Sequence, residues 1–438
     1  MTDRPNFTIE IHQNKYLAEG DSQVHAIVRV KAGGAPAGLA ARPAGAAEVI
    51  IVDTSGSMVG ERLGAAKRAA KAAVDALREG VGFAVVSGAD EATMIYPRDL
   101  LLAPATNHNR AQAKAAIAKL SATGGTRMGR WLTLANTLFA EHHGGIRHAI
   151  LLTDGKNEHE TPAELDAALA ACAGRFVCDC RGVGTDWEVA ELRRVSTALL
   201  GSLRLVADPQ HLAADFTKMI EAAMGKAIAD VVLRVWTPHN ATPRFVKQVL
   251  PSMQDLSDKR VEIGPPGGGP KTGDYPTGIW GKETRDYHLC ITVPAGAPHE
   301  ELLAARISMV LPGSGDTPDV SLAGGGILAE WTDDEARSTR HVLVERYTGR
   351  EKLVDAIQKG LKAYKKGDDD AAADELGQAV GLAAKAGDEE ISRRLNKVVD
   401  VDPVTGATYL KKEVDKAHEM ELDVMSTESI PPPSENGD

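Results

Sequence analysis

The chain has 438 residues, of which 43% are hydrophobic, 25% charged and only 4% aromatic, an ordinary composition for a globular protein. Its length suits about two or three domains. The 50 basic and 61 acidic residues give a formal charge of −11, which argues against nucleic acid or an anionic membrane as the main partner, because both bind basic faces. No apolar run is long enough to span a membrane, and residues 1–6 contain no apolar signal core, so we expect a cytoplasmic location.

The first elements predicted along the chain are two antiparallel strands. Residues 7–12 and 23–31 alternate apolar and polar positions, and a Gly/Asp turn lies between them. Residues 32–47, rich in Ala, Gly and Pro, are predicted to be a linker or crossover. Two strands cannot bury a core alone, so we expect them to join strands from elsewhere in the chain.

From Glu48 the pattern changes to apolar strands that alternate with helices. The predicted strands are 48–53, 81–88, 147–153, 175–183 and 202–207, with a short edge strand at 92–97. The predicted helices are 60–79, 107–121, 127–143, 162–173, 187–199 and 209–226. Apolar strands of this kind are typical of a mostly parallel sheet with helices on both faces. The sequence therefore predicts a doubly wound α/β domain over residues 48–226.

After residue 227 the chain returns to short strands, with a Gly/Pro loop at 264–270. The predicted strands are 230–237, 244–250, 286–293 and 302–311. We expect residues 227–331 and the strands of residues 1–47 to form one β-sandwich into which the α/β domain is inserted.

The rest of the chain has a helical pattern. Helices are predicted at 338–366, 368–386 and 388–399, separated by Gly-Asp pairs, a helix stop followed by an N-cap. Residues 332–425 are thus predicted to be an α-helical module. Residues 426–438 are acidic and rich in Pro, which predicts a disordered tail.

The cysteines and histidines do not form a recognisable metal or redox motif. Cys172, Cys178, Cys180 and Cys290 are too few for a disulfide framework, and their spacing does not fit a zinc knuckle. We expect buried structural thiols. No His-x-x-x-His pair occurs, so histidines near the α/β core, such as His148, are predicted to be packing or surface residues.

Acidic and hydroxyl side chains follow two of the predicted parallel strands. Asp53, Ser55 and Ser57 come at the end of strand 48–53, and Asp154 follows strand 147–153. Thr126 precedes a predicted helix. Open α/β sheets bind ligands at the carboxyl ends of their strands, and hard oxygen donors suit Mg²⁺ or Mn²⁺ better than zinc. Taken singly, each of these residues is better explained by a turn or a helix cap than by metal binding.

Together, the three segments resemble the metal-ion-dependent adhesion site of the von Willebrand factor A family, written Asp-x-Ser-x-Ser, then a distant Thr, then a distant Asp. The resemblance covers residues 48–225 and implies a Rossmann-like fold. It implies that the metal ligands are Asp53, Ser55, Ser57, Thr126 and Asp154. In the family, a carboxylate of the binding partner fills an open position on the metal.

The resemblance thus implies a non-enzymatic, metal-dependent protein-interaction module or scaffold. Intracellular bacterial members act beside AAA+ ATPases or kinase/phosphatase signalling systems, which are the partner classes it suggests. Two alternatives are a metal-dependent phosphoester hydrolase and a secreted adhesin that lacks its leader. The hydrolase would need a second acid cluster, a base or a nucleophile, none of which is evident beside the motif.

Overall fold

The computed structural model describes residues 6–33, 45–142, 145–206, 208–226, 228–264, 271–313, 317–402, 407–411 and 413–428. Most of the predicted linker, the Gly/Pro loop from residue 265 on and the tail from residue 429 on lie outside these ranges. The chain forms two compact units. We call them the α/β unit, mainly residues 45–230 with 278–282, and the sandwich unit, mainly residues 6–33, 231–277 and 283–428.

The α/β unit is built on one mixed, mostly parallel sheet. Its strands are β4 (Ala46–Asp53), β5 (Gly82–Gly88), β6 (Ala92–Tyr96), β7 (Ala103–Pro104), β8 (Ile146–Thr153), β9 (Val177–Val183) and β10 (Leu203–Val206). The order is β10-β9-β8-β4-β5-β6, and β7 also pairs with β5. Neighbouring strands from β10 to β5 are parallel, whereas β6 and β7 run antiparallel to β5. The predicted doubly wound sheet is confirmed.

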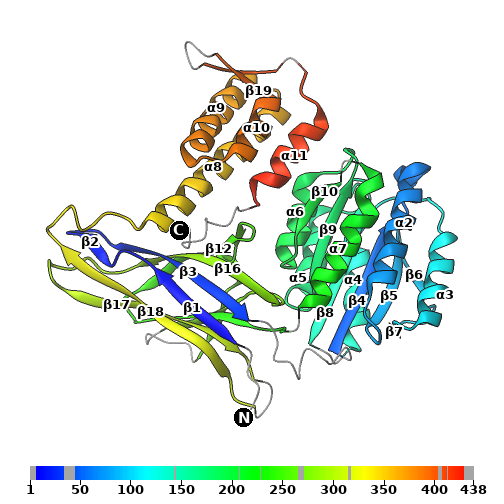
Figure 1. Ribbon diagram of the computed structural model, residues 1–438, viewed down its shortest axis with the longest axis horizontal. Coiled ribbons are helices and arrows are strands. Elements are labelled where there is room, and N and C mark those ends of the chain that lie inside the picture. Colours follow the sequence, from blue (N-terminus) through cyan, green and yellow to red (C-terminus); the bar gives the residue numbers. More distant parts are fainter. Residues whose placement is uncertain are drawn as a thin grey trace, which may run out of the picture. The chain divides into compact units, whose positions relative to one another are not determined.

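Helices cover both faces of this sheet (Figure 1). One layer contains α2 (Glu61–Ala76), α3 (Asn107–Ala118) and α7 (Leu212–Gly225). The other contains α4 (Met128–Ala140), α5 (Pro162–Cys172) and α6 (Val189–Ala198). Because β4 and β8 are adjacent and parallel, their carboxyl ends lie at the same edge of the sheet.

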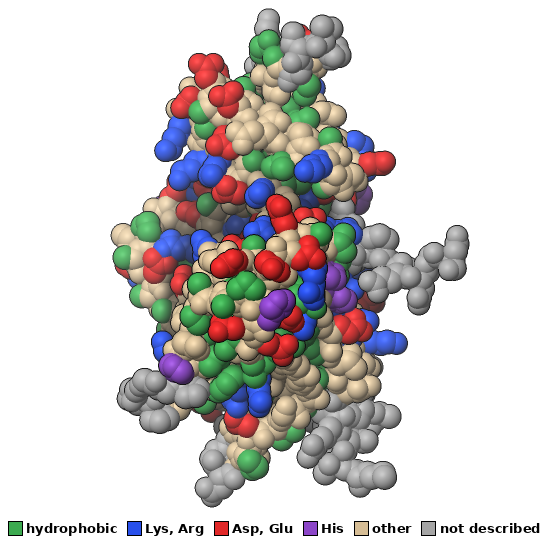
Figure 2. Space-filling view, turned by 90° about the vertical axis from the view of Figure 1, so that its left-hand side faces the viewer, with side chains coloured by type: hydrophobic (Ala, Val, Ile, Leu, Met, Phe, Trp, Pro, Cys, Tyr) green, Lys and Arg blue, Asp and Glu red, His purple; other side chains and the backbone are tan. Residues whose placement is uncertain are grey.

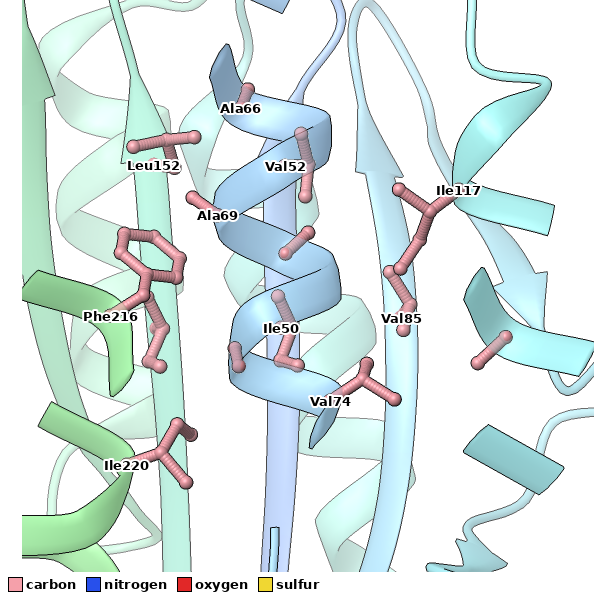
Figure 3. Packing of buried hydrophobic residues seen from close by; sticks show 14 of the residues in the cluster. Ile50, Val52, Ala66, Ala69, Val74, Val85, Ile117, Leu152, Phe216 and Ile220 are labelled. Atoms are coloured by element: carbon pink, nitrogen blue, oxygen red, sulfur yellow. The ribbon is translucent and has the colours of Figure 1, made fainter. Parts of the chain in front are cut away.

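Small side chains bring α2 close to the centre of the sheet. Figure 3 shows Ala66 and Ala69 of α2 over Ile50 and Val52 of β4, with Phe216 of α7 to one side. All five side chains are fully buried. This packing fixes both ends of the loop that joins β4 to α2, which is the loop with the Asp-x-Ser-x-Ser pattern.

A buried ionic triad crosses three strands near the opposite end of the sheet. His148 on β8 lies 2.8 Å from a carboxylate oxygen of Glu48 on β4 and 3.1 Å from one of Asp179 on β9. His148 is only 3% exposed, and Glu48 is fully buried. His148 is therefore more than a packing residue, because it is the shared cation of the buried carboxylate of Glu48 and the partly buried carboxylate of Asp179.

The sandwich unit contains two sheets, and each combines strands that precede the α/β segment in the sequence with strands that follow it. One has the order β1 (Phe7–His12), β3 (Gln23–Gly33), β16 (Lys282–Thr292), β12 (Thr242–Leu250), β13 (Gln254–Asp255). The other has the order β14 (Val261–Ile263), β15 (Lys271–Pro276), β11 (Val232–Thr237), β17 (Glu301–Leu311), β18 (Val320–Thr332), β2 (Tyr16–Ala18). Contacts between β1 and β18 join the two sheets. The predicted insertion of the α/β domain into a sandwich is thus observed.

The sequence pattern does not predict the long strand β18 or the shorter β15. β18 contains Gly324, Gly325 and Gly326, and glycine is depleted in strands. The structure gives a reason for Gly325, because a Cβ there would clash with Ile11 of β1. Gly325 therefore permits the two sheets to approach each other at this point.

The C-terminal region is helical, as predicted, and packs on the sandwich. Its helices are α8 (Val342–Lys365), α9 (Asp369–Ala386), α10 (Glu389–Val398) and α11 (Lys416–Ser426). The region also holds a small hairpin, β19 (Val399–Val401) with β20 (Thr408–Leu410), and neither the hairpin nor α11 was predicted. Asp368 and Asp388 cap α9 and α10, as the Gly-Asp pattern predicted.

A buried polar contact ties α8 to the five-stranded sheet. Asp286 of β16 is fully buried and accepts two 2.9 Å hydrogen bonds from Arg29 and a 2.6 Å hydrogen bond from the Tyr347 hydroxyl. Beside it, Ile27 and Val249 pack against Leu343, Val344 and Tyr347. The finer division into five parts, 1–47, 48–226, 227–331, 332–425 and 426–438, stays a prediction.

Three further observations bear on the composition. All four cysteines are buried and unpaired, as expected. No helix in the described ranges is long and apolar enough to cross a membrane. On the face drawn in Figure 2, acidic and basic side chains are interspersed, and no broad basic area is visible.

Candidate functional site

The five predicted site residues lie together at the carboxyl edge of the α/β sheet. Asp53 is the last residue of β4, and Ser55 and Ser57 lie in the loop between β4 and α2. Asp154 directly follows β8, and Thr126 lies two positions before the first residue of α4. The fold therefore brings together residues that are about 100 positions apart in the chain.

Three hydroxyl groups converge in front of the Gly155 α-carbon. The Oγ atoms of Ser55 and Ser57 are 3.0 Å apart. A Cβ built on Gly155 would lie 3.1 Å from Ser57 Oγ, 3.3 Å from Thr126 Oγ1 and 3.8 Å from Ser55 Oγ. Only a residue without a side chain leaves this space among the hydroxyls free.

Asp53 lies behind the hydroxyl groups and is fully buried. Its Oδ1 accepts a 2.7 Å hydrogen bond from the Ser55 amide, and its Oδ2 accepts one from the Thr153 hydroxyl. Burial raises the pKa of Asp53 to about 6, although these hydrogen bonds favour the ionised form. A cation beside Asp53 would favour the ionised carboxylate.

Asp154 is also fully buried, and both of its oxygens have partners. Its Oδ1 accepts a 2.7 Å hydrogen bond from Ser57 Oγ, and its Oδ2 accepts a 2.9 Å hydrogen bond from Arg62. Asp154 is therefore placed to orient the Ser57 hydroxyl, with the proton of Ser57 held away from the space in front of Gly155.

Helix capping does not account for these residues. α4 has Arg127 as its N-cap residue, with no side-chain cap bond. Its first amides, those of Met128 and Gly129, instead donate to the side chains of Asn157 and Glu160 at 2.9 and 2.8 Å. α2 has Gly60 as its N-cap. Asp53 does stabilise a turn, because it accepts a hydrogen bond from the Ser55 amide. Thr126, in contrast, is not the N-cap residue of α4.

Backbone hydrogen bonds join the loop after β4 to the loop that precedes α4. Gly56 N donates to Gly124 O at 2.9 Å, and Thr123 N donates to Thr54 O at 2.7 Å. The Thr54 hydroxyl lies 2.6 Å from Ser87 Oγ on β5. Thr54 is therefore a supporting residue that the motif itself does not reveal, because its role depends on a distant strand.

The donor set fits a hard divalent cation. Neighbouring ligands around octahedral Mg²⁺, each about 2.0–2.1 Å from the ion, are about 2.9 Å apart. The Ser55 and Ser57 oxygens, 3.0 Å apart, have this spacing. No group of three His, Cys, Asp or Glu side chains in the described part of the chain could hold a metal, so a metal here would depend on the hydroxyls.

Comparison with known proteins agrees with the fold. A model of the von Willebrand factor type A domain matches residues 47–205, and a model of the von Willebrand factor type A C-terminal domain matches residues 381–426. The structure of a von Willebrand factor type A protein from Catenulispora acidiphila is 46% identical in sequence, covers 98% of each chain and has a TM-score of 0.92. The chain belongs to the von Willebrand factor A family, whose members often mediate metal-dependent protein interactions.

Two more distant relatives show how far the similarity extends. The ArnB paralog VWA2 from Sulfolobus acidocaldarius shares the fold over 97% of this chain and 98% of its own, with a TM-score of 0.60 and 13% identity. An uncharacterized protein of Synechocystis sp. is 27% identical over 213 residues, which are 48% of this chain and 49% of that protein. The match thus spans about half the length of that curated relative.

Replacing Gly155 with alanine should weaken metal binding without unfolding the α/β unit. The new methyl group would lie among the Ser55, Ser57 and Thr126 hydroxyls. We expect Mg²⁺ affinity, measured by titration calorimetry, to fall by about tenfold or more, as when groups around a metal are disturbed. The matched control is Gly64→Ala on α2, whose Cβ would make only an ordinary 3.6 Å contact with Arg68. Equal affinities for the two variants would show that the space before Gly155 is not the metal position.

Proposed function

We propose that this protein is a non-enzymatic, metal-dependent protein-interaction module or scaffold that captures an Asp or Glu side chain of a partner protein. Asp53, Ser55, Ser57, Thr126 and Asp154 hold the metal, which is Mg²⁺ or Mn²⁺. The observation that carries this proposal is the convergence of three hydroxyls before Gly155, backed by two buried carboxylates.

The contacts suggest a different role for each kind of residue. The hydroxyls of Ser55, Ser57 and Thr126 are the direct donors, because they line the free space. Asp53 and Asp154 act from behind, since their oxygens are already engaged by Ser55, Thr153, Ser57 and Arg62. When bound, Mg²⁺ supplies an electrophilic centre whose charge uncharged hydroxyls do not neutralise, so an acidic side chain from outside is attracted to it.

The partner is thus a protein that presents an acidic side chain, in the cytoplasm. AAA+ ATPases and kinase/phosphatase signalling systems are the partner classes to examine first. Ser57, the exposed member of the site, is the residue that such a partner would approach.

Calorimetry with acetate as the probe carboxylate tests the capture mechanism. Mg²⁺ is titrated into the protein in sodium acetate and in sodium chloride of equal ionic strength, with correction for Mg²⁺ bound by free acetate. If the site accepts a carboxylate on the metal, acetate must tighten Mg²⁺ binding, because coupling between two ligands is reciprocal. A Ser57→Ala variant should lose this tightening. Mg²⁺ binding that is indifferent to acetate would rule out carboxylate capture. A pull-down with Mg²⁺ and with EDTA would then identify the natural partner.

A further inference from the structure

Arg62 is the residue beside the candidate site that the family motif does not explain. It is the second residue of α2, and a cation is unfavourable there because the helix dipole is positive at its N-terminus. Its position therefore needs a compensating interaction.

Arg62 forms this interaction with two acidic side chains, one that follows β8 and one in the loop after β9. One guanidinium nitrogen of Arg62 donates to Asp154 Oδ2 at 2.9 Å, and another donates to Asp186 Oδ2 at 2.6 Å. Asp154 is fully buried, whereas the side chains of Arg62 and Asp186 are 36% and 55% exposed. The ion pair of Arg62 with the buried Asp154 is thus the stronger one, because water screens the pair of Arg62 with Asp186.

The bridge also determines how Asp154 can act. With Oδ2 held by Arg62, only Oδ1 is directed to the site, and it accepts the proton of Ser57 Oγ. Arg62 therefore orients Asp154 toward Ser57 and offsets its negative charge. The positive charge of Arg62 is separated from the Ser57 hydroxyl by the Asp154 side chain. At this position it repels a metal ion and attracts an anion.

We propose that Arg62 is a positioning and specificity-determining residue, which makes the site bind Mg²⁺ more weakly and carboxylates more strongly than the hydroxyls and acids would alone. The inference rests on the proposed metal-dependent capture and adds a trade-off between the two ligands. Occupancy by the metal then depends on the partner, since metal and carboxylate bind well only together.

The test uses the calorimetric titrations in chloride and in acetate, with Arg62→Gln. In chloride, we expect Mg²⁺ affinity to rise by about three- to tenfold, because the carboxylate of Asp154 is no longer neutralised. In the wild type, acetate should increase the Mg²⁺ affinity above its value in chloride. In Arg62→Gln, this increase should be less than half as large. A variant that merely disturbs the fold would weaken both, so the opposite signs identify the charge effect.

Two other variants serve as controls. Arg68→Gln removes the same charge from an exposed position about 9 Å further along the same helix and should leave both titrations unchanged. Arg62→Lys keeps the charge and should recover part of the acetate effect, even if the bridge to Asp186 is lost.

The outcomes separate the two proposals. If wild-type protein binds Mg²⁺ and responds to acetate, but Arg62→Gln binds Mg²⁺ no more tightly, the role of Arg62 is wrong and the capture function stands. If Arg62→Gln shows the same acetate response as the wild type, the specificity role is likewise wrong. If the wild type itself does not bind Mg²⁺ or does not respond to acetate, the proposed function fails and the inference fails with it.

Discussion

Replacing His148 with leucine is expected to lower the free energy of unfolding of the α/β unit by about 3–5 kcal/mol, the usual cost of removing one partner from a buried ionic network. Leucine would fill much of the space but would leave Glu48 and Asp179 facing each other without a cation. Hydrogen exchange of the β8 amides measures the change, because buried central strands open only with the whole unit.

The exposed histidine of α3 provides a control for this substitution. His108→Leu removes an exposed imidazole that lies 3.0 Å from Gln112 Nε2, and it should change stability by less than about 0.5 kcal/mol. A similarly small effect for His148→Leu would show that the triad is dispensable.

The pH dependence of the same variant has a defined sign. Burial alone lowers the pKa of His148, but the charges and hydrogen bonds of Glu48 and Asp179 outweigh burial and raise it to about 10. A raised histidine pKa stabilises the fold fully below the unfolded value of about 6.5 and loses this contribution as pH rises toward the folded value. The stability difference between wild type and His148→Leu should therefore be largest near pH 5–6.5, about the unfolded histidine pKa, and shrink as pH approaches 10.

The contribution of Asp179 to stability has the opposite pH dependence, because it is lost in acid. Burial raises its pKa, but the hydrogen bond and charge of His148 dominate and hold the pKa well below its usual range. Its contribution is present above the unfolded value of about 3.9 and is lost as pH falls below that value. The triad therefore stabilises the sheet most between these two limits.

Replacing Asp53 with alanine is expected to remove most Mg²⁺ binding, with a loss of about a hundredfold in affinity, the upper range for groups behind a metal. Asp53 is fully buried beside the hydroxyls, and its oxygens accept from Ser55 and Thr153, whereas Asp154 accepts from Arg62. In wild-type protein, Mg²⁺ at 100 times its dissociation constant should add about 2.7 kcal/mol of stability by mass action, and EDTA should remove it.

Two variants make this result specific. Asp53→Asn keeps the size of the side chain and an acceptor for the Ser55 amide, so a similar loss of Mg²⁺ binding in this variant points to charge and not to collapse of the loop. Asp75→Asn removes an exposed charge from the other end of α2, about 20 Å along the helix, and should bind Mg²⁺ like the wild type. Mg²⁺ stabilisation that survives in Asp53→Ala would place the metal elsewhere.

The sequence was sufficient to predict those features that depend on local pattern or on strand direction. Alternating strands and helices predict a parallel sheet, and a parallel sheet brings Asp53 and Asp154 to one edge. Gly-Asp pairs predict the starts of α9 and α10, because a left-handed glycine ends one helix and an aspartate caps the next.

The features that were missed depend on packing between distant segments. The bridge from Arg62 to Asp154 spans 92 positions, and the pair of His148 and Glu48 spans 100, so no local pattern contains them. An arginine in the first turn of a helix was the one available signal for Arg62, since the helix dipole disfavours it. β18 was missed because glycine is depleted in strands, whereas Gly325 serves the contact between the two sheets, which strand propensity does not measure.

The position of the metal is the central claim, and diffraction from crystals soaked in MnCl₂ tests it most directly. Mn²⁺ takes the same oxygen ligands as Mg²⁺ and scatters anomalously, so it marks its own site. We predict one strong anomalous peak among the hydroxyls of Ser55, Ser57 and Thr126, in front of Gly155, and no such peak in Asp53→Ala crystals. A wild-type crystal whose Mn²⁺ lies elsewhere, with these hydroxyls unliganded, would contradict the account.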